Sequence, residues 1–329
     1  MKKQIVPVLA FLIAFAIFFG AGEILMRLYT WRVVSYDVEM TRYAMEVKEQ
    51  SPNKDIGHVH RPGAQATLMG VPVSINNDGL RDRDYPVERT GARRYVFLGD
   101  SLTMGWGVAA EQSFAKRLEA KLNAQAPTEV LNFGHGNYNT VQEVNLFLEK
   151  GLKYKPDAVV LFYFINDAEA TPAVSRWEAL GNSRFITFFW SRIKSLLSRL
   201  DEQKSFQGYY SGLYADDQPG WKAAKDAILL LKRTTAERGI DLKVVLLPEL
   251  HDPAHYPFAA EHAKLMDFLA RNGIAALDIT PAFKDAGDPH GLWVALDDAH
   301  PNARAHGIIA DAALDFISKD SNGRADKPR

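Results

Sequence analysis

The sequence predicts an α/β fold with a parallel sheet, because short apolar runs alternate with helix-compatible segments over most of the chain. Five runs predict strands, near residues 95–98, 129–132, 158–164, 242–247 and 275–278, and a last helix is expected from Ala303 to Ile317. Strands separated by helices join through right-handed crossovers, so helices should cover both faces of one sheet. Five such strands predict a three-layer α/β/α architecture with the doubly wound, flavodoxin-like order.

Composition and charge narrow the class of protein. The chain has 329 residues, of which 47% are hydrophobic, so a sizeable core is expected. Lys and Arg number 39 against 40 Asp and Glu, which gives a net charge of −1. Such a balance offers no basic field to hold nucleic acid, so nucleic-acid binding is excluded. Cysteine is absent, which excludes disulfides and thiolate chemistry.

The first 30 residues predict an N-terminal transmembrane helix. Residues 4–22 carry no charge. A bilayer span needs about 20 apolar residues and the hydrophobic region of a signal peptide only about 7–15, so the length favours an anchor. A signal peptide cleaved near Gly20-Ala21-Gly22 is the alternative. Basic residues flank the span on both sides, so the positive-inside rule barely selects an orientation.

A lead-in segment separates the anchor from the first predicted strand. The mixed charge of Tyr36 to Glu49 predicts a helical stalk, and residues 64–75 predict two short strands that turn near Gly70. Beyond Ile317 the chain is polar and has no means of burying itself. The expected organisation is an anchor (1–30), a stalk and lead-in (31–92), an α/β domain (93–318) and a disordered tail (319–329).

The chain is organised around Gly99-Asp100-Ser101, where the first apolar run ends. Ser101 should lie at the carboxyl end of a strand, which is the edge where open α/β sheets bind ligands. The helix that follows would aim its N-terminal N–H groups at developing negative charge. A turn capped by Asp100 and Ser101, with no catalytic role, is the structural alternative.

Three further polar stretches follow Ser101 in the sequence. They are Asn132-Phe133-Gly134-His135-Gly136-Asn137, Asn166-Asp167 and Asp297-Asp298-Ala299-His300-Pro301-Asn302. Together with the serine stretch they resemble the four blocks of the SGNH/GDSL hydrolase family, which is named for its Ser, Gly, Asn and His. Gly79-Leu80-Arg81-Asp82 also matches a segment that anchored members carry before the serine block.

The resemblance implies a serine esterase with the corresponding site residues. Ser101 would be the nucleophile and His300 the base that takes its proton. The family spacing assigns Asp297, three residues before His300, to orient the imidazole, with Asp298 as the alternative. The oxyanion donors would be the Ser101 N–H, a backbone N–H of the second block and the Asn166 side chain.

Two positions depart from the family pattern. Asn137 stands where the second block has its last glycine, and Gly136 lies one place earlier. Asn tolerates the left-handed conformation, so we expect a positive φ at Asn137 and assign the oxyanion donor to its N–H, with Gly136 as the alternative. Phe164 replaces the glycine that precedes the Asn-Asp pair of the third block, and its bulk should narrow the site.

Other segments have two interpretations each. Glu249 and His251 follow the fourth strand at the active edge and are expected to line the substrate cleft, although an ordinary polar loop fits equally. Arg184–Leu200 is rich in aromatic and basic residues; it suits a membrane surface or a lid, and packing on the core is favoured. The acidic residues near His300 lack metal-ligand spacing, so neither a metal nor a cofactor is expected.

The sequence therefore predicts an enzyme that hydrolyses acyl esters, of acetyl type, on an envelope glycan or related polymer through an acyl-enzyme. Because the resembling anchored proteins act on envelope material, we expect a single pass through the inner membrane by residues 4–22, a periplasmic catalytic domain, and the machinery of polysaccharide synthesis as a partner. The alternatives are an O-acyltransferase, a lipid esterase or lysophospholipase, and a non-catalytic carbohydrate-binding partner in a polysaccharide modification or export complex.

Overall fold

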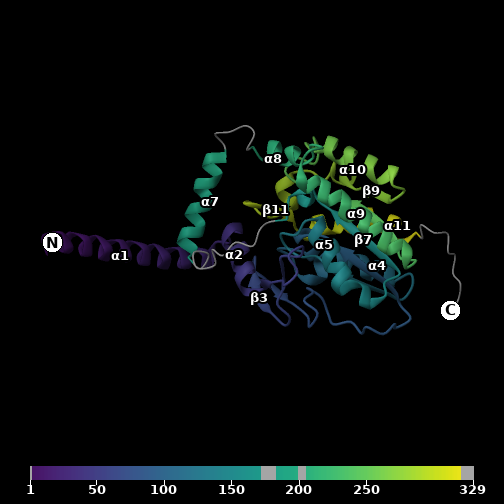
Figure 1. The fold of residues 1–329 in the computed structure, drawn as a ribbon, viewed down its shortest axis with the longest axis horizontal. Coiled ribbons are helices and arrows are strands. Elements are labelled where there is room, and N and C mark those ends of the chain that lie inside the picture. Colours follow the sequence, from purple (N-terminus) through teal and green to yellow (C-terminus); the bar gives the residue numbers. More distant parts are fainter. Residues whose placement is uncertain (1, 172–182, 199–204, 320–329) are drawn as a thin grey trace.

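The computed structural model describes residues 2–171, 183–198 and 205–319. Its body is a three-layer α/β/α structure around one five-stranded sheet (Figure 1). The strands run in the order β6-β5-β7-β8-β9, and all neighbours are parallel. They are β5 (Arg93–Leu98), β6 (Thr128–Asn132), β7 (Ala158–Tyr163), β8 (Asp241–Leu246) and β9 (Ala275–Asp278). The predicted fold class and doubly wound order are confirmed.

Helices cover both faces of the sheet, as the crossover rule requires. On one face lie α5 (Thr140–Leu146), α9 (Pro219–Glu237) and α10 (Ala259–Arg271), and on the other α4 (Phe114–Asn123) and α11 (Ala303–Ser318). The shorter helices of the body are α3 (Ser101–Met104) and α8 (Phe206–Leu213). The last predicted helix is therefore present as α11, one residue longer than expected.

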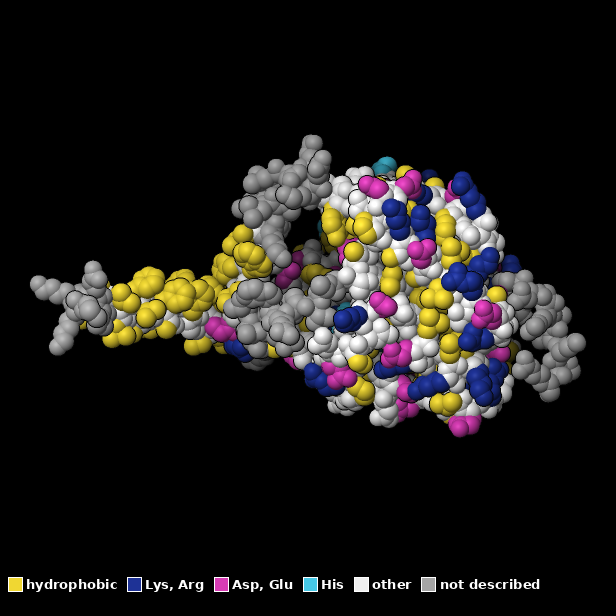
Figure 2. All heavy atoms as spheres, viewed as in Figure 1, with side chains coloured by type: hydrophobic (Ala, Val, Ile, Leu, Met, Phe, Trp, Pro, Cys, Tyr) yellow, Lys and Arg dark blue, Asp and Glu magenta, His cyan; other side chains and the backbone are white. Residues whose placement is uncertain are grey.

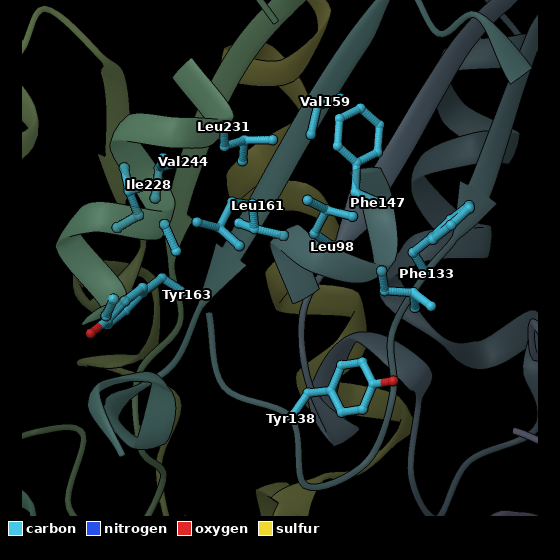
Figure 3. Packing of buried hydrophobic residues seen from close by; sticks show 14 of the residues in the cluster. Leu98, Phe133, Tyr138, Phe147, Val159, Leu161, Tyr163, Ile228, Leu231 and Val244 are labelled. Carbon is cyan, nitrogen blue, oxygen red and sulfur yellow. The ribbon is translucent and has the colours of Figure 1, made fainter. Parts of the chain in front are cut away.

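The central strand β5 divides its side chains between the two cores. Val96 and Leu98 face the core under α5, α9 and α10, whereas Tyr95 and Phe97 face the core under α4 and α11. This alternation follows from the two-residue period of a strand. Figure 3 shows Leu98 in the first core, among side chains of neighbouring strands and helices. Burial on both faces explains the continuous apolar run that predicted the strand.

The N-terminal helix α1 (Lys2–Arg32) projects from the body (Figure 1). Within the described residues it is the one helix long and apolar enough to cross a membrane, over Val6–Thr30, with a mean hydropathy of 2.4 over its best window. Hydrophobic side chains cover this projection in Figure 2, and none of that window is buried. Such a helix fits a membrane anchor or a signal sequence.

The segment between α1 and the sheet packs against the part of the body that carries Ser101. It contains α2 (Tyr36–Glu46) and two antiparallel pairs, β1 (Lys48–Gln50) with β2 (His58–His60) and β3 (Gln65–Leu68) with β4 (Val71–Ser74). Its buried side chains share a core with Met104 and Trp106, just after Ser101. Of the predicted tail, residues 320–329 lie outside the described residues.

Buried aromatic rings join this segment to the loop after β6. The His60 and His135 rings stack with centroids 3.8 Å apart, and the Tyr138 ring also stacks on His135, at 4.8 Å. The Nδ1–H of His60 donates to the Gly79 carbonyl, which leaves Nε2 to accept from the Tyr43 hydroxyl at 2.6 Å. Burial lowers the pKa of His60 well below its usual 6.5 and that of His135 to about 3. The folded protein therefore holds these imidazoles neutral.

This stack predicts a loss of stability in mild acid. An unfolded histidine binds a proton near pH 6.5, while the buried ring does not. The contribution of each buried imidazole to the free energy of unfolding is therefore complete above pH 6.5 and falls as the pH drops below it. The expected loss is about 1 kcal/mol per buried imidazole at about pH 5.5. Denaturant unfolding of His135→Phe should show a smaller loss between about pH 7.5 and pH 5.5 than the parent chain.

His255→Gln is the matched control, because the His255 side chain is 88% exposed. Its pH dependence should equal that of the parent chain. An equal loss in His135→Phe and the parent would contradict the neutral stack.

Candidate active site

The nucleophile turn is built from three consecutive residues after β5. The Asp100 carboxylate accepts the Leu102 N–H at 2.8 Å and so caps α3, which begins at Ser101. A Cβ at Gly99 would lie 2.0 Å from the Thr103 hydroxyl oxygen, so only glycine permits this close turn. Ser101 consequently lies at the carboxyl edge of the sheet, as its sequence position predicts.

The serine hydroxyl is hydrogen-bonded to a histidine from the far end of the chain. His300 lies on β11 (Asp298–Pro301), which pairs with β10 (Trp293–Ala295), and its Nε2 is 2.8 Å from the Ser101 Oγ. The Nδ1 of His300 is 2.5 Å from the Asp298 Oδ1. Ser101, His300 and Asp298 thus form one hydrogen-bonded chain, with the geometry of a base that can take the serine proton.

The structure corrects the predicted orienting carboxylate, which is Asp298 and not Asp297. Asp298 and His300 are two places apart on β11, so their side chains share a side of the strand, whereas Asp297 precedes the strand, in the turn after β10. Asp297 is exposed, and its carboxylate accepts the Tyr36 N–H at 3.3 Å. The family spacing places the aspartate three residues before the histidine, but the strand conformation of β11 favours the residue two places before it.

Two aromatic side chains cover the imidazole and its carboxylate. The Trp106 indole N–H donates to the Asp298 Oδ2 at 2.8 Å, and the Tyr36 ring lies 5.7 Å from the His300 ring. Burial raises the pKa of Asp298, but the adjacent His300 and the hydrogen bonds from His300 and Trp106 outweigh it, so this pKa lies below its usual range. Asp298 is therefore ionised at neutral pH.

The residues predicted to supply the oxyanion donors follow the carboxyl ends of β5, β6 and β7. Asn137 has a φ of 65°, the left-handed conformation expected of it. The Gly136 N–H donates to the Tyr43 hydroxyl at 2.9 Å, which favours Asn137 over Gly136 as the donor. The Asn166 Nδ2 lies 3.1 Å from the Asp100 carboxylate. An amide nitrogen carries two hydrogens, so one remains for an oxyanion.

The lead-in segment supplies supports that the sequence analysis missed. The buried Arg81 guanidinium donates to the carbonyls of Gly105 and Val108, just after α3. The Lys48 ammonium donates at 2.8 Å to both the Gly136 carbonyl and the Asn137 side-chain oxygen. Arg81 lies in a segment that the family resemblance marked, whereas nothing in the sequence links Lys48 to Asn137.

A pocket of about 400 Å³ opens beside His300. Phe164 lines it, so the residue that replaces the family glycine does border the site. The other lining residues include both predicted cleft residues and several aromatic side chains: Tyr36, Leu102, Phe206, Tyr210, Glu249, His251, Trp293, Leu296 and His300. The pocket therefore combines aromatic walls with a small number of polar groups, as ligand sites commonly do.

Glu249 and His251 form a second polar pair in this pocket. The Glu249 carboxylate is buried and hydrogen-bonds the Nδ1 and the N–H of His251. The hydrogen bond that His251 donates to Glu249 raises the pKa of His251 against the opposing effect of burial. Rings of Phe206 and Trp293 pack on the imidazole, with centroids 4.9 Å and 4.8 Å away. Across the described ranges, no group of three or more His, Asp or Glu side chains has the arrangement of a metal site.

The contact between Asp298 and His300 predicts unequal effects for two neighbouring substitutions. Asp298→Asn keeps the shape but removes the charge and replaces one of the two acceptor oxygens by a donor, so kcat for an aryl ester should fall on the order of 10³- to 10⁴-fold. Asp297→Asn should change kcat by less than about tenfold. Steady-state kinetics of the two variants compare them directly. A larger loss in Asp297→Asn would restore the family assignment.

The left-handed backbone at Asn137 predicts a second pair of outcomes. Asn137→Gly should keep most of the activity, because glycine adopts a positive φ without strain. Asn137→Val should lose activity, because a β-branched side chain is strained there. The ratio of kcat values is the measurement. If Asn137→Val keeps the activity of the parent chain, the donor is not at Asn137.

Comparisons with known proteins bear on this geometry. Residues 97–308 match the model of the GDSL-like lipase/acylhydrolase family. Among solved structures, the acetylxylan esterase Axe2 from Geobacillus stearothermophilus is 16% identical, with a TM-score of 0.45 and coverage of 69% of this chain and 95% of that chain. TesA is 12% identical, with a TM-score of 0.44 and coverage of 68% and 98%. A comparison with curated proteins finds no match.

These structural similarities concern the fold, whereas the family model spans more than half of the chain, from within β5 into α11. That span contains Ser101, Asn166, Asp298 and His300. The chain belongs to the GDSL-like lipase/acylhydrolase family, the SGNH/GDSL hydrolases.

Proposed function

We propose that the protein is a membrane-anchored serine esterase that removes acyl groups, of acetyl type, from a glycan of the cell envelope. The observation that carries the esterase assignment is the chain from Ser101 Oγ through His300 to Asp298, with contacts of 2.8 Å and 2.5 Å at the edge of an open pocket. This arrangement supplies a nucleophile, a base and a group that orients the base.

The reaction follows from the positions of these atoms. The Ser101 oxygen attacks the ester carbonyl carbon while the His300 Nε2 takes the serine proton. The N–H groups of Ser101 and Asn137 and the Asn166 amide stabilise the oxyanion that forms. His300 then returns the proton to the departing alcohol oxygen, which leaves Ser101 acylated. A water molecule gives a proton to His300 and attacks the acyl carbon, and His300 then returns this proton to the Ser101 oxygen as the acid leaves.

The walls of the pocket support a glycan as the alcohol part of the ester. Aromatic faces of Tyr36, Tyr210 and Trp293 can cover the apolar C–H face of a sugar ring, and Glu249 and His251 offer hydrogen-bond partners for its hydroxyl groups. A sugar hydroxyl in place of water would accept the acyl group from Ser101. Acyl transfer is therefore a second outcome of the same acyl-enzyme.

The anchor and the location are part of the same proposal. The exposed, apolar α1 supports a single pass through the inner membrane, with the catalytic body in the periplasm beside the machinery of polysaccharide synthesis. An ester substrate on an envelope glycan would be accessible to the body on that side of the membrane.

The proposal predicts that full-length protein in detergent releases acetate from acetylated glycans faster than it cleaves lysolipids. Ser101→Ala should lower turnover of both glycans and short-chain aryl esters by roughly 10⁴-fold, because the nucleophile is lost. Product analysis by mass spectrometry measures release and transfer together.

Each other outcome identifies a different function. An acetyl group found on an added sugar indicates an acyltransferase, and preferred cleavage of lysolipids indicates a lipid esterase. Ser101→Ala activity within about tenfold of the parent would refute the nucleophile. Glycan binding without turnover in the parent chain would favour the non-catalytic binding protein.

A further inference from the structure

Helix α7 (Arg184–Ser198) lies outside the α/β body. It packs against α1 and α2 (Figure 1), and none of its side chains described over residues 184–193 is buried. Packing on the core, which the sequence analysis favoured for Arg184–Leu200, is therefore wrong for the described part of that segment. The apolar side chains of α7 must therefore be covered by something other than the α/β body.

A carboxylate of α1 holds the beginning of α7. Glu23 accepts the backbone N–H groups of Arg184 at 3.3 Å and Phe185 at 3.1 Å, and the Ser183 hydroxyl at 2.8 Å. The first N–H groups of a helix have no partner within the helix, and a negative charge there is favourable. The two helices are thus joined by a specific cap.

Aromatic contacts extend this junction along α1. The Phe185 ring meets Phe18 and Phe19 with centroids 5.9 Å and 5.5 Å away, and a Cβ at Gly22 would lie 2.8 Å from that ring. Further along, the Phe188 ring meets Tyr29 at 6.0 Å. Gly22 therefore provides the space in which α7 approaches α1.

The junction lies at the end of the uncharged stretch of α1. Residues 4–22 carry no charge, and as helix they are about 28 Å long, close to the hydrocarbon thickness of a bilayer. Glu23 therefore marks the boundary between hydrocarbon and headgroups. From this boundary α7 runs across the direction of α1 (Figure 1). A helix with this start and direction lies along the membrane surface.

The surface of α7 has the composition of such a helix. Phe189, Trp190 and Ile193 are each about half exposed, and hydrophobic side chains continue from α1 onto the base of α7 in Figure 2. The sequence 184–200 contains four basic residues and no acidic one. Apolar and aromatic residues combined with positive charge are typical of helices that lie in the interface of an anionic leaflet.

We propose that α7 is an interfacial helix that lies in the headgroup region of the leaflet next to the catalytic body, with lipid rather than protein covering its exposed apolar face. This inference rests on the proposed anchor. It adds that lipid also contacts α7, which an anchor by α1 alone does not require.

The same helix places the pocket at the membrane surface. Arg192 of α7 is paired with Asp37 at 3.2 Å, and the neighbouring Tyr36 packs on His300. Tyr36 is only four positions after the end of α1 at Arg32, so the pocket wall lies within about 14 Å of that end. The substrate is therefore an acyl ester presented close to the bilayer.

The test uses the absence of cysteine from the chain, because one introduced cysteine accepts one fluorophore. Full-length Leu12→Cys in α1, Ile193→Cys in α7 and Glu237→Cys at the end of α9 are labelled with a nitrobenzoxadiazole probe. All three native side chains are about half exposed or more. Each protein is reconstituted into vesicles of phosphatidylcholine and phosphatidylglycerol, and emission is measured with a spin-labelled lipid and, separately, with aqueous iodide.

We expect the probes at residues 12 and 193 to lose most of their emission to the spin-labelled lipid and little to iodide, and the probe at residue 237 to do the reverse. If residue 193 behaves like residue 237 while residue 12 is quenched by lipid, the interfacial helix is refuted and the anchor stands. Protection of residue 193 from both quenchers means that protein covers it, which also refutes the proposal.

Exposure of residues 12 and 193 to iodide alone refutes the anchor and the interfacial helix together. Because quenching does not depend on turnover, the result is independent of the Ser101→Ala test of the esterase.

Discussion

The hydrogen-bonded chain from Ser101 through His300 to Asp298 is the constraint on which the function of this fold depends. It joins side chains 199 positions apart in the sequence. The parallel sheet brings the end of β5 to the active edge, and the β10–β11 hairpin returns the histidine to the same edge. A serine hydroxyl is a weak nucleophile until a base takes its proton. A displacement of Ser101 or His300 by about 1 Å would therefore lower the reaction rate, on the order of 10²-fold.

The segment between the anchor and the sheet is part of the site. Arg81 fixes the loop after α3, Lys48 binds the side chain of Asn137, and Tyr36 covers His300. The three contacts are made to three different parts of the candidate site: the loop after α3, Asn137 and His300. These residues lie within 50 positions of the end of α1, so the geometry of the site and the attachment of the anchor are linked through short, ordered stretches of chain.

Sequence patterns predicted the sheet well because β5, β7 and β8 are buried on both faces and consequently contain apolar runs, over residues 95–98, 158–163 and 244–246. The left-handed backbone at Asn137 also followed from residue type. The orienting carboxylate did not, since Asp297 and Asp298 are chemically identical and differ only in place: Asp297 lies in the turn before β11 and Asp298 on the strand. Lys48, Trp106 and the place of α7 depend on tertiary contacts between distant segments, which carry no local signal.

The central claim is that Ser101 is a nucleophile activated by His300. Intact-mass measurement after exposure to a fluorophosphonate tests it directly, because the reagent forms a stable adduct with an activated serine. The account predicts a single adduct, mapped to Ser101, that is absent from Ser101→Ala and strongly slowed in His300→Ala. No adduct on the parent chain, or equal labelling of the parent and His300→Ala, would contradict it.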